Sequence, residues 1–252
     1  MAYKKLISPE FRITTDKYEI TSGMEVEIFS SRAARSDWSK VELTSQYEGL
    51  VTYEDMEEAK VELGYDDDFD TLLDGYCRKS GNDYWKEIMI RDAMIKLERI
   101  TVKQTFLDCT PQDIIKWVLA QAGITEYQLS NEEFGKRDVV IISEQNGIKA
   151  IAQVNSDWGI EKDFFFQNKV FYWGCKPEQK NIYVLDESEN ILSLNKIGDL
   201  YEIETLGVPW IHHSQEIEVV HSKYSGIVTV EKTITRSNSD GFTRMFIYFK
   251  GG

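Results

Sequence analysis

Short stretches in which apolar and polar residues alternate are the commonest pattern in this chain. In Met-Glu-Val-Glu-Ile, residues 24–28, apolar side chains alternate with acids, which predicts a strand with one buried face. By the same criterion we predict strands over 11–14, 20–29, 40–43, 49–53, 59–65, 72–77, 84–90, 139–142, 164–166, 170–173, 181–185, 190–194, 200–205, 216–221, 226–235 and 242–249. The polar and basic stretch 30–40 is predicted to be a loop. Short strands at this spacing favour a small barrel or sandwich.

One segment has the helical period instead. Thr110 is a good N-cap, Pro111 suits the first helical position, and Asp113 stands where the acid of a capping box belongs. An apolar face at helical spacing follows, made of Ile114, Ile115, Val118, Leu119 and Ala122. Gly123 is placed to end the helix. We therefore predict a helix over 110–122.

Residues 147–156 fit two structures. Asn146-Gly147 could turn a β-hairpin, because this dipeptide tolerates the positive φ angles of a tight turn. The residues that follow, Ile148, Ile151, Ala152 and Asn155, instead have helical spacing, and we favour a helix. The sequence shows no internal repeat and no low-complexity linker.

Length and composition bound the architecture. A chain of 252 residues can form one large domain or two to three small ones, each with its own core. A hydrophobic fraction of 42% excludes wholesale disorder. The aromatic residues, 12% of the chain, fall mostly in short runs between turn residues, and aromatic side chains fit a pleated, half-buried surface. We therefore expect a mainly β (α+β) protein.

Negative charge is concentrated in one stretch. The net charge is −14, and residues 41–75 contain twelve acids against a single lysine. Such a field repels phosphates, so we expect no stable nucleic-acid binding.

No apolar run approaches the roughly 18 residues of a membrane span. Residues 1–10 also lack the apolar core of a secretory signal, so we expect no membrane insertion. Without a signal, we expect Cys77, Cys109 and Cys175 to be reduced thiols.

One group of acids has the spacing with which a calcium loop begins. These residues are Asp66, Asp68 and Asp70. The pattern then fails, because Thr71 and Cys77 stand where the loop requires glycine and glutamate. A solvated acidic turn explains the cluster better than a metal site.

The histidines do not form a recognisable site either. His212 and His213 are adjacent, and neighbouring residues on a strand point to opposite faces, so they cannot easily share a zinc ion. We expect these two and His221 to lie in the core or to face a partner. No cysteine stands at a nucleophile elbow, and no glycine-rich phosphate loop or dinucleotide fingerprint is present. We predict no catalytic residue, no metal and no cofactor.

Several motifs, in chain order, resemble late-control-D-type baseplate hub proteins. They are Lys60-Val61-Glu62-Leu63-Gly64-Tyr65 with Leu72-Leu73-Asp74-Gly75-Tyr76, the Asp-containing stretch 90–97, the helix 110–115 with Gln121-Ala122-Gly123-Ile124, and the segments 208–211, 228–232 and 239–245. In that family the first run belongs to a barrel and the Asp-containing stretch is a strand. The family includes hubs of contractile phages, R-type bacteriocins and defective prophages, and the related spike proteins of type VI secretion.

The resemblance implies a fold and a function. It implies two small β-barrels with an intervening α/β segment, which we divide into an N-terminal barrel (1–107), a helix-containing middle segment (108–162) and a C-terminal barrel (163–252). In the family a homotrimer sets six barrels around a ring and adapts a sixfold tail tube to a threefold spike. This chain is short for the family. The helix 110–122 is expected to pack between barrels or against a neighbour.

The implied function is that of a structural, non-enzymatic subunit. Its partners would be further copies of itself, the tail tube protein, the central spike protein and other baseplate proteins. Its place would be the baseplate of a virion or tail particle that is assembled in the bacterial cytoplasm.

A hub encloses the channel through which DNA or tube contents leave. A lining that includes Glu54, Glu57, Glu58, Asp66 and Asp68 would repel phosphates and let them pass. A solvated outer face would give the same sequence pattern, and the residues favour neither alternative.

Two other functions stay open. Trp38, Trp158, Trp173 and Trp210 suggest a carbohydrate- or receptor-binding tail module, which would display exposed, coplanar aromatic rings. The many acids leave room for a cell-wall hydrolase, which would hold two carboxylates with divergent pKa values in one cleft.

Overall fold

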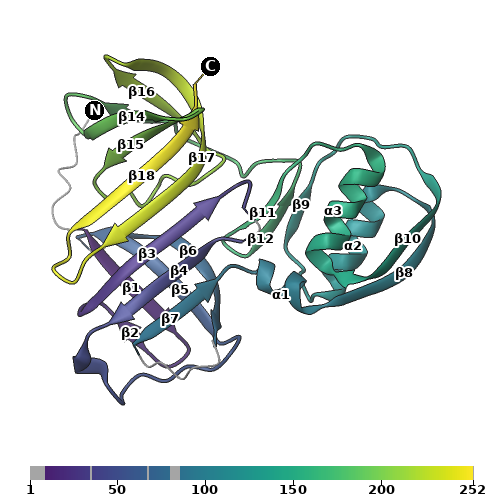
Figure 1. Cartoon of the computed structure of the whole chain (residues 1–252), viewed down its shortest axis with the longest axis horizontal. Helices are drawn as coiled ribbons and strands as arrows, with labels where there is room; N and C mark the ends of the chain where they lie inside the picture. The colour runs from purple at the N-terminus through teal and green to yellow at the C-terminus, as the bar shows by residue number, and fades with distance from the viewer. Residues whose placement is uncertain (1–8, 35, 67, 80–85, 252) are drawn as a thin grey trace.

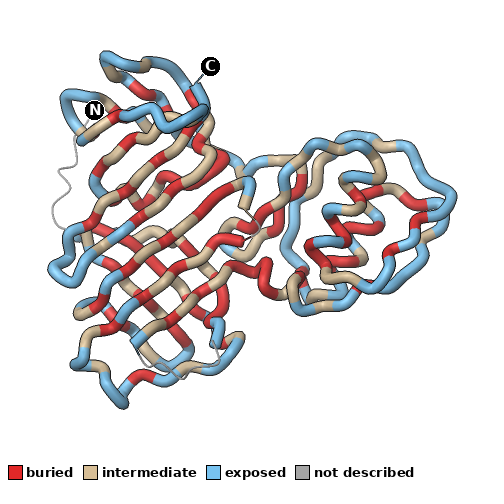
Figure 2. The backbone as a smooth tube through the Cα atoms, viewed as in Figure 1, coloured by how far each residue is buried: buried red, intermediate tan, exposed pale blue. Residues whose placement is uncertain are grey.

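The chain forms two β-barrels and an α/β lobe that projects from the place where the barrels meet (Figure 1). This computed structural model describes residues 9–34, 36–66, 68–79 and 86–251. Each of the three parts contains buried residues (Figure 2), and their apolar side chains form three separate cores. The predicted fold class, mainly β with two small barrels and an intervening α/β segment, is confirmed.

The first barrel is built from seven strands and one short 3-10 helix. They are β1 (Glu10–Thr15), β2 (Glu19–Ile20), β3 (Met24–Ser31), β4 (Trp38–Leu43), the 3-10 helix Ser45–Tyr47, β5 (Glu58–Tyr65), β6 (Asp68–Arg78) and β7 (Glu87–Arg91). Alternation sets the inside, because Met24, Val26 and Ile28 of β3 point into the core while the acids between them point out.

The lobe carries all three α-helices of the described residues. Its elements are α1 (Met94–Arg99), β8 (Thr101–Cys109), α2 (Pro111–Gln121), β9 (Tyr127–Leu129), β10 (Arg137–Asn146), α3 (Gly147–Trp158), β11 (Phe164–Gln167) and β12 (Val170–Trp173). Strands β8 and β10 pair antiparallel, and α2 and α3 pack against each other. The core of the lobe runs from Ala93 to Trp173 and includes Tyr76, so it extends beyond both ends of the middle segment 108–162.

The second barrel contains β13 (Tyr183–Asp186), β14 (Ile191–Ile197), β15 (Leu200–Thr205), β16 (Glu216–His221), β17 (Tyr224–Ser237) and β18 (Thr243–Lys250). Strand β18 shows strict alternation: Met245, Ile247 and Phe249 are fully buried, and the residues between them face outward.

The two barrels repeat one topology. The first has the strand order β3-β4-β7-β6-β5-β1, and the second has the order β14-β15-β18-β17-β16-β13. Read along the chain, every strand of the first barrel except β2 has a counterpart in the second, so β3 corresponds to β14 and β6 corresponds to β17. Only the last pairing differs in direction, since β1 pairs β5 antiparallel and β13 pairs β16 parallel. No internal repeat in the amino-acid sequence corresponds to this repeat of topology.

Both predicted helices are confirmed. Helix α2 has the full capping box, in which the Thr110 hydroxyl accepts the backbone N–H of Asp113 and the Asp113 carboxylate accepts that of Thr110. Helix α3 begins where the Asn146 side chain accepts the backbone N–H of Lys149, and it ends at Gly159 in the left-handed region. Helix α2 lies inside the lobe and not between the barrels, because its apolar face packs on α3 and β8; the alternative that it contacts a neighbouring subunit stays a prediction.

Three predictions about strands were wrong. Residues 49–53 form no strand; they run as a loop, tied by the Tyr53 hydroxyl that donates to the backbone oxygen of Glu87 at 2.9 Å. The stretch 90–97 is not one strand, because the Asp92 carboxylate accepts the backbone N–H of Met94 and so starts α1. Residues 30–40 are only in part a loop, since β3 continues to Ser31 and β4 starts at Trp38. Residues 84 and 85 lie outside the described residues.

Because β6 packs closely on β7 at Gly75, we expect one added methyl group there to lower the stability of the fold. A Cβ atom added to Gly75 would lie 2.0 Å from the backbone oxygen of Arg91. Gly75→Ala should therefore lower the free energy of unfolding by about 1–3 kcal/mol, through overpacking. Gly135→Ala is the matched control, because a Cβ there meets nothing within 4 Å. Denaturant titration of the two variants checks this, and equal stabilities would contradict it.

Candidate functional site: the barrel seam and the lobe junction

One pair of strands joins the barrels. Strand β17 pairs antiparallel with β3, from Lys232 opposite Ser31 to Ser237 opposite Val26. The barrels therefore share one continuous sheet, in the order β14-β15-β18-β17-β3-β4-β7-β6-β5-β1-β2 (Figure 1). We call the β17–β3 pairing the seam. Backbone hydrogen bonds across it fix the position of one barrel against the other.

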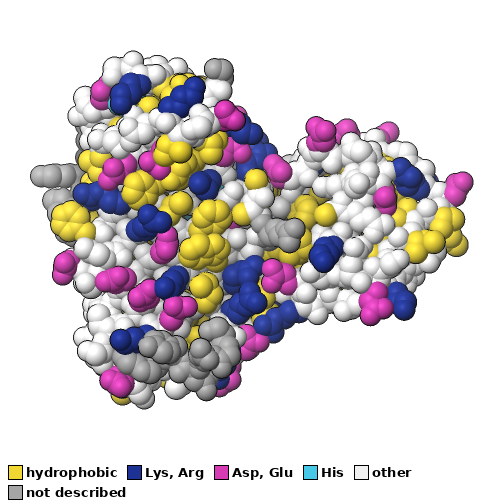
Figure 3. Space-filling view, in the orientation of Figure 1, with side chains coloured by type: hydrophobic (Ala, Val, Ile, Leu, Met, Phe, Trp, Pro, Cys, Tyr) yellow, Lys and Arg dark blue, Asp and Glu magenta, His cyan; other side chains and the backbone are white. Residues whose placement is uncertain are grey.

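The outer face of this sheet carries an apolar row across the seam. Phe246, Ile234, Phe29 and Trp38 are successive partners on β18, β17, β3 and β4. All four are partly exposed, and the rings of Phe29 and Trp38 stack with centroids 5.7 Å apart. Figure 3 shows hydrophobic side chains gathered over these strands, with charged side chains around them.

Charged side chains flank the row in opposite-sign pairs. The ion pairs are Arg236–Glu27 at 2.8 Å, Lys40–Glu87 at 3.3 Å, Lys40–Glu42 and Arg244–Glu204 at 3.4 Å. Arg236 and Glu27 face each other directly across the seam. Exposed pairs of this kind contribute little individually, so backbone pairing and the apolar row carry most of the seam's stability.

Two buried carboxylates lie where the lobe leaves the first barrel. Asp37 precedes β4 and Asp92 follows β7, and their side chains are 6% and 4% exposed. Asp37 accepts from the Ser30 hydroxyl at 2.5 Å and from the Ser31 N–H at 2.9 Å. Asp92 accepts from the backbone N–H of Asp37 at 3.1 Å, so the two acids belong to one network. This network ties α1, and with it the lobe, to the barrel.

Burial raises the pKa of Asp92 to about 8, and the negative charge of Asp37 adds to the shift. The hydrogen bonds agree with a protonated Asp92. The Ser36 hydroxyl lies 2.6 Å from Asp92 Oδ1 and 3.0 Å from the backbone oxygen of Asp37, but it has one proton. If Asp92 donates to Ser36, the serine proton is free for the Asp37 oxygen, and both acceptors are satisfied.

Two close carboxyl groups, one of which has a raised pKa, are part of what a hydrolase requires. Here every carboxyl oxygen is nevertheless hydrogen-bonded within the chain, to Ser30, Ser31 and Ser36 and to the backbone N–H groups of Asp37 and Met94. The arrangement stabilises the junction and presents no free acid to a substrate.

The second barrel reaches the same junction through two histidines. His213 is 1% exposed, its ring meets that of Phe165 edge-on at 4.6 Å, and its Nε2 lies 3.5 Å from Asp37 Oδ2. His212 is buried beside it, and burial, with a contribution from His213, lowers the pKa of His212. The pair thus lies in the core at the meeting point of all three parts.

A hairpin tip also fastens the lobe to the first barrel, at β5 and β6. Asn168 and Lys169, between β11 and β12, both have positive φ angles, as a tight two-residue turn requires. The Lys169 amine lies 2.8 Å from Glu58 Oε2 and 3.1 Å from Asp74 Oδ1, and 5.3 Å from the centre of the Tyr76 ring. The hydrogen bond from Lys169 lowers the pKa of Glu58. Two further ion pairs join the parts, Arg32–Asp163 and Arg99–Asp55.

The five acids proposed for a channel lining lie at the two ends of the β5–β6 hairpin. Glu54, Glu57 and Glu58 precede or begin β5, while Asp66 and Asp68 lie at its turn. Glu57 is buried, accepts the backbone N–H of Glu54 and pairs with Lys17 at 3.3 Å. The structure therefore does not gather the five in one cluster, and none lies on β3, β4, β17 or β18.

The four tryptophans do not form one platform. Trp173 is fully buried, and its indole donates to the Asn155 side chain. Trp38 stacks on Phe29, Trp210 stacks on Tyr183, and Trp158 lies under Arg137. They occupy different parts of the chain, so no set of coplanar exposed rings arises from them.

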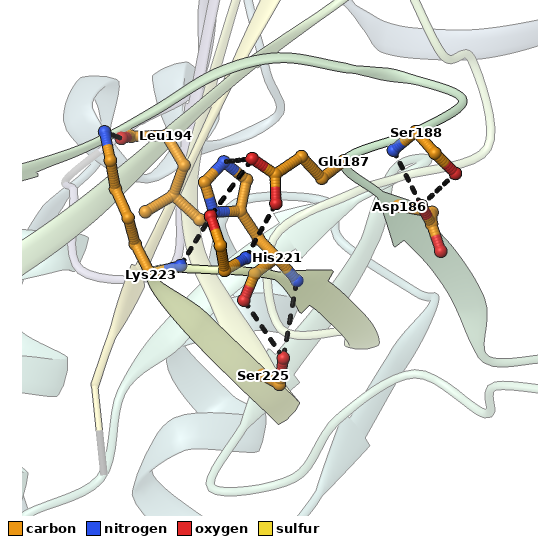
Figure 4. A network of polar contacts seen from close by, with 8 residues as sticks. Asp186, Glu187, Ser188, Leu194, His221, Lys223 and Ser225 are labelled. Carbon is orange, nitrogen blue, oxygen red and sulfur yellow. Dashed lines mark hydrogen bonds and ion pairs between the residues drawn. The ribbon is translucent and has the colours of Figure 1, made fainter.

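His221 lies in a network that fixes a turn (Figure 4). The backbone N–H of Lys223 donates to its Nδ1 at 3.0 Å, so the ring presents its other nitrogen to Glu187, 3.5 Å away. Ser222 donates to Glu187 rather than to a free ring nitrogen. A nucleophile needs an unoccupied base nitrogen. The network instead holds the β16–β17 turn against the β13–β14 turn.

Within the described ranges, no three His, Cys, Asp or Glu side chains are placed to hold a metal ion. In the same part of the chain, no helix is long and apolar enough to cross a membrane. Cys77 and Cys109 are buried and Cys175 is partly buried, and all three are free thiols.

No family model matches this chain, and no curated protein matches its sequence. Solved structures do match its fold. A 43 kDa tail protein of prophage MuSo2 from Shewanella oneidensis has a TM-score of 0.74 at 12% identity, over 96% of this chain and 98% of that one. A tail protein from Neisseria meningitidis MC58 has a TM-score of 0.72 at 11% identity, over 97% of both chains.

A third match comes from outside phages. The E. coli c3393 protein, described as a component of the type VI secretion system with structural similarity to the T4 tail proteins gp27 and gp5, has a TM-score of 0.72 at 13% identity. The match covers 95% of this chain and 76% of that one. At such low identities the likeness shows the fold alone: this chain has the fold of these tail and secretion proteins.

The buried Asp92 predicts an unusual dependence of stability on pH. The folded chain keeps the Asp92 proton up to about pH 8, whereas an unfolded aspartate loses it near pH 4. Between these values the folded state binds more protons, so this group's contribution to the free energy of unfolding falls as pH rises. Asp92→Asn cannot ionise. Its stability deficit against the parent chain should therefore be larger at pH 5 than at pH 8.

Asp113→Asn is the matched control, because hydrogen bonds from the backbone and hydroxyl of Thr110 lower the pKa of Asp113. The contribution of Asp113 to the free energy of unfolding is lost as pH falls. The stability deficit of Asp113→Asn should therefore not be larger at pH 5 than at pH 8. Denaturant titration at both pH values makes the comparison. An Asp92→Asn deficit that is the same at pH 5 and pH 8 would contradict a protonated Asp92.

Proposed function

We propose that this chain is a structural hub subunit of the baseplate of a phage-type contractile tail, and that it acts by assembly and not by catalysis. The observation that carries the proposal is the seam, which makes two barrels of one topology into a single rigid pair. The fold likeness to a prophage tail protein and to a type VI secretion component supports it.

A subunit with two like barrels can join a sixfold ring to a threefold one. A subunit with one barrel needs six copies to fill a sixfold ring, whereas a subunit with two like barrels needs three. Three copies would offer six similar barrels toward a sixfold tube while keeping threefold symmetry for a spike. We propose this homotrimeric ring, with the tail tube protein on one side, the central spike protein on the other and further baseplate proteins around it, in a particle assembled in the bacterial cytoplasm.

The lobe gives each subunit a second surface. It is fixed to the barrels at two places, by the Asp37–Asp92 network and by Lys169. A projecting, rigidly held lobe is suited to contacts outside the ring. We propose that it meets other baseplate proteins.

The acidic channel lining is a separate part of the proposal. Of the five acids, Glu57 is buried and Glu58 is paired with Lys169, while Glu54, Asp66 and Asp68 are exposed. Lysine at these three positions should slow release of DNA or tube contents from assembled particles, because the channel would then attract phosphates. Unchanged ejection or killing by such particles would contradict the proposal that these acids line the channel.

Solution mass tests the ring directly. Light scattering of the purified chain over a range of concentrations should give three times the 29.2 kDa of one chain, or a monomer that becomes a trimer with a spike protein. Negative-stain images of that species should show a closed ring with threefold symmetry. A chain that stays monomeric at all concentrations, with spike and tube proteins present, would contradict the proposal. Glycan binding by that monomer would favour the receptor-binding module.

A further inference from the structure

Two buried histidines form the contact of the second barrel with the junction. His212 and His213 lie in the segment between β15 and β16, and both line a small cavity. The other walls of this cavity come from the first barrel, the start of α1 and the β11–β12 hairpin of the lobe, and they include Ser30, Leu73 and Gln167. The second barrel therefore meets both other parts of the chain at this pair.

Four acids surround His212, and two of them belong to the buried network. Asp37, which precedes β4, is hydrogen-bonded to serine donors and lies 3.5 Å from His213. Asp92, which precedes α1, keeps its proton up to about pH 8 and is therefore neutral in acid. Of these two, Asp37 alone carries a charge that attracts a proton to His212.

The other two acids lie on β6. Asp74 is paired with Lys169 of the lobe at 3.1 Å, whereas Asp70 attracts a proton to His212. Burial outweighs the attraction of the acids and, with a contribution from His213, lowers the pKa of His212. The imidazole of His212 therefore stays neutral in the folded chain at a pH where an exposed histidine, with a pKa of about 6.5, is already charged.

The stretch that carries the pair is short and contains a strained residue. The His212 N–H donates to the side chain of Gln215 at 3.0 Å, and the Ser214 N–H donates to the backbone oxygen of Val230 at 2.7 Å. Ser214 has a φ of 67°, in the left-handed region that residues other than glycine rarely adopt. Such a short stretch can open locally while the rest of the barrel stays folded.

We propose that His212 is an acid-sensitive switch: when its imidazole takes up a proton, the stretch 212–215 leaves the junction and releases the second barrel from the lobe and from the Asp37–Asp92 network. This inference does not depend on the proposed ring. The seam is not part of the switch, because β17 pairs with β3 through Lys232 to Ser237, outside this stretch. Acid therefore loosens the junction and leaves the shared sheet intact.

The direction of the effect follows from proton binding. In the open state His212 binds a proton below about pH 6.5, whereas in the closed state it does so only at a lower pH. Between these two values the open state binds one more proton, so its population rises by up to about tenfold for each pH unit of acidification. Asp92 does not oppose this change, because its hydrogen-bond partners Ser36, Asp37 and Met94 lie outside the stretch that opens.

Hydrogen exchange of single amides in the full chain, measured from pH 5 to 7.5 and corrected for the intrinsic effect of pH, tests the switch. Protection of the His212 and Ser214 amides should fall by up to about tenfold per pH unit below about pH 6.5. The seam amides of 232–237 and the core amide of Ile247 should show no comparable fall. His212→Gln should abolish the response to acid. The matched control His221→Gln, which removes the histidine at the β16–β17 turn, should keep it.

Two results would overturn the switch. One is a parent chain whose His212 and Ser214 amides keep the same protection from pH 5 to 7.5. The other is a His212→Gln chain that responds to acid as the parent does.

The parent chain supplies a second measurement if His212→Gln does not fold. Nuclear magnetic resonance can follow the rings of the three histidines, and the His212 ring should titrate below about pH 6.5, together with the loss of protection at Ser214. A His212 ring that titrates near pH 6.5 while the Ser214 amide stays protected would contradict the proposal. None of these outcomes depends on whether the chain forms a ring.

Discussion

The architecture depends on the pairing of β17 with β3. These strands are about 200 residues apart in sequence, and their hydrogen bonds turn two small barrels into one sheet that runs from β14 to β2. A small barrel alone has little core, whereas two barrels joined through backbone hydrogen bonds cannot rotate freely against each other. The apolar row from Phe246 to Trp38 continues across this pairing and supports it on the outer face. A rigid pair of like barrels is what a ring with threefold and pseudo-sixfold symmetry needs from its subunit.

The lobe adds a second constraint at the same place. Its first helix starts from Asp92, whose carboxyl group shares a buried network with Asp37 at the beginning of β4. His213 brings the second barrel to this network, and Lys169 ties the β11–β12 hairpin of the lobe to β5 and β6. Buried polar groups are costly unless each finds a partner, so a network that spans three parts favours one arrangement of them. The junction is therefore a structural device, although two close carboxylates resemble a catalytic pair at first sight.

Local signals were enough for some elements and not for others. The capping box of α2 and the alternation in β18 are set by neighbouring residues, and both were predictable. Strand β8 was missed because only Val102 and Cys109 of its nine residues are buried, which leaves no alternation to detect. The seam, the barrel repeat and the Asp37–Asp92 pair arise from contacts between residues far apart in the chain. A single sequence carries no local pattern that predicts such contacts. A local signal for Asp92 does exist, since an acid before the apolar Met94-Ile95 favours a helix start. The family resemblance predicts a strand over the same residues.

Amide hydrogen exchange at the seam tests the central claim most directly, because the account requires both barrels to share one sheet. The amides of 26–31 and 232–237 should exchange as slowly as those in the barrel cores, for example at Ile247 and Val61, which are fully buried. Protection at the seam far below that of both cores would mean that the barrels open independently. In that case the two barrels would not act as one rigid unit, and the proposed ring of three such units would be contradicted.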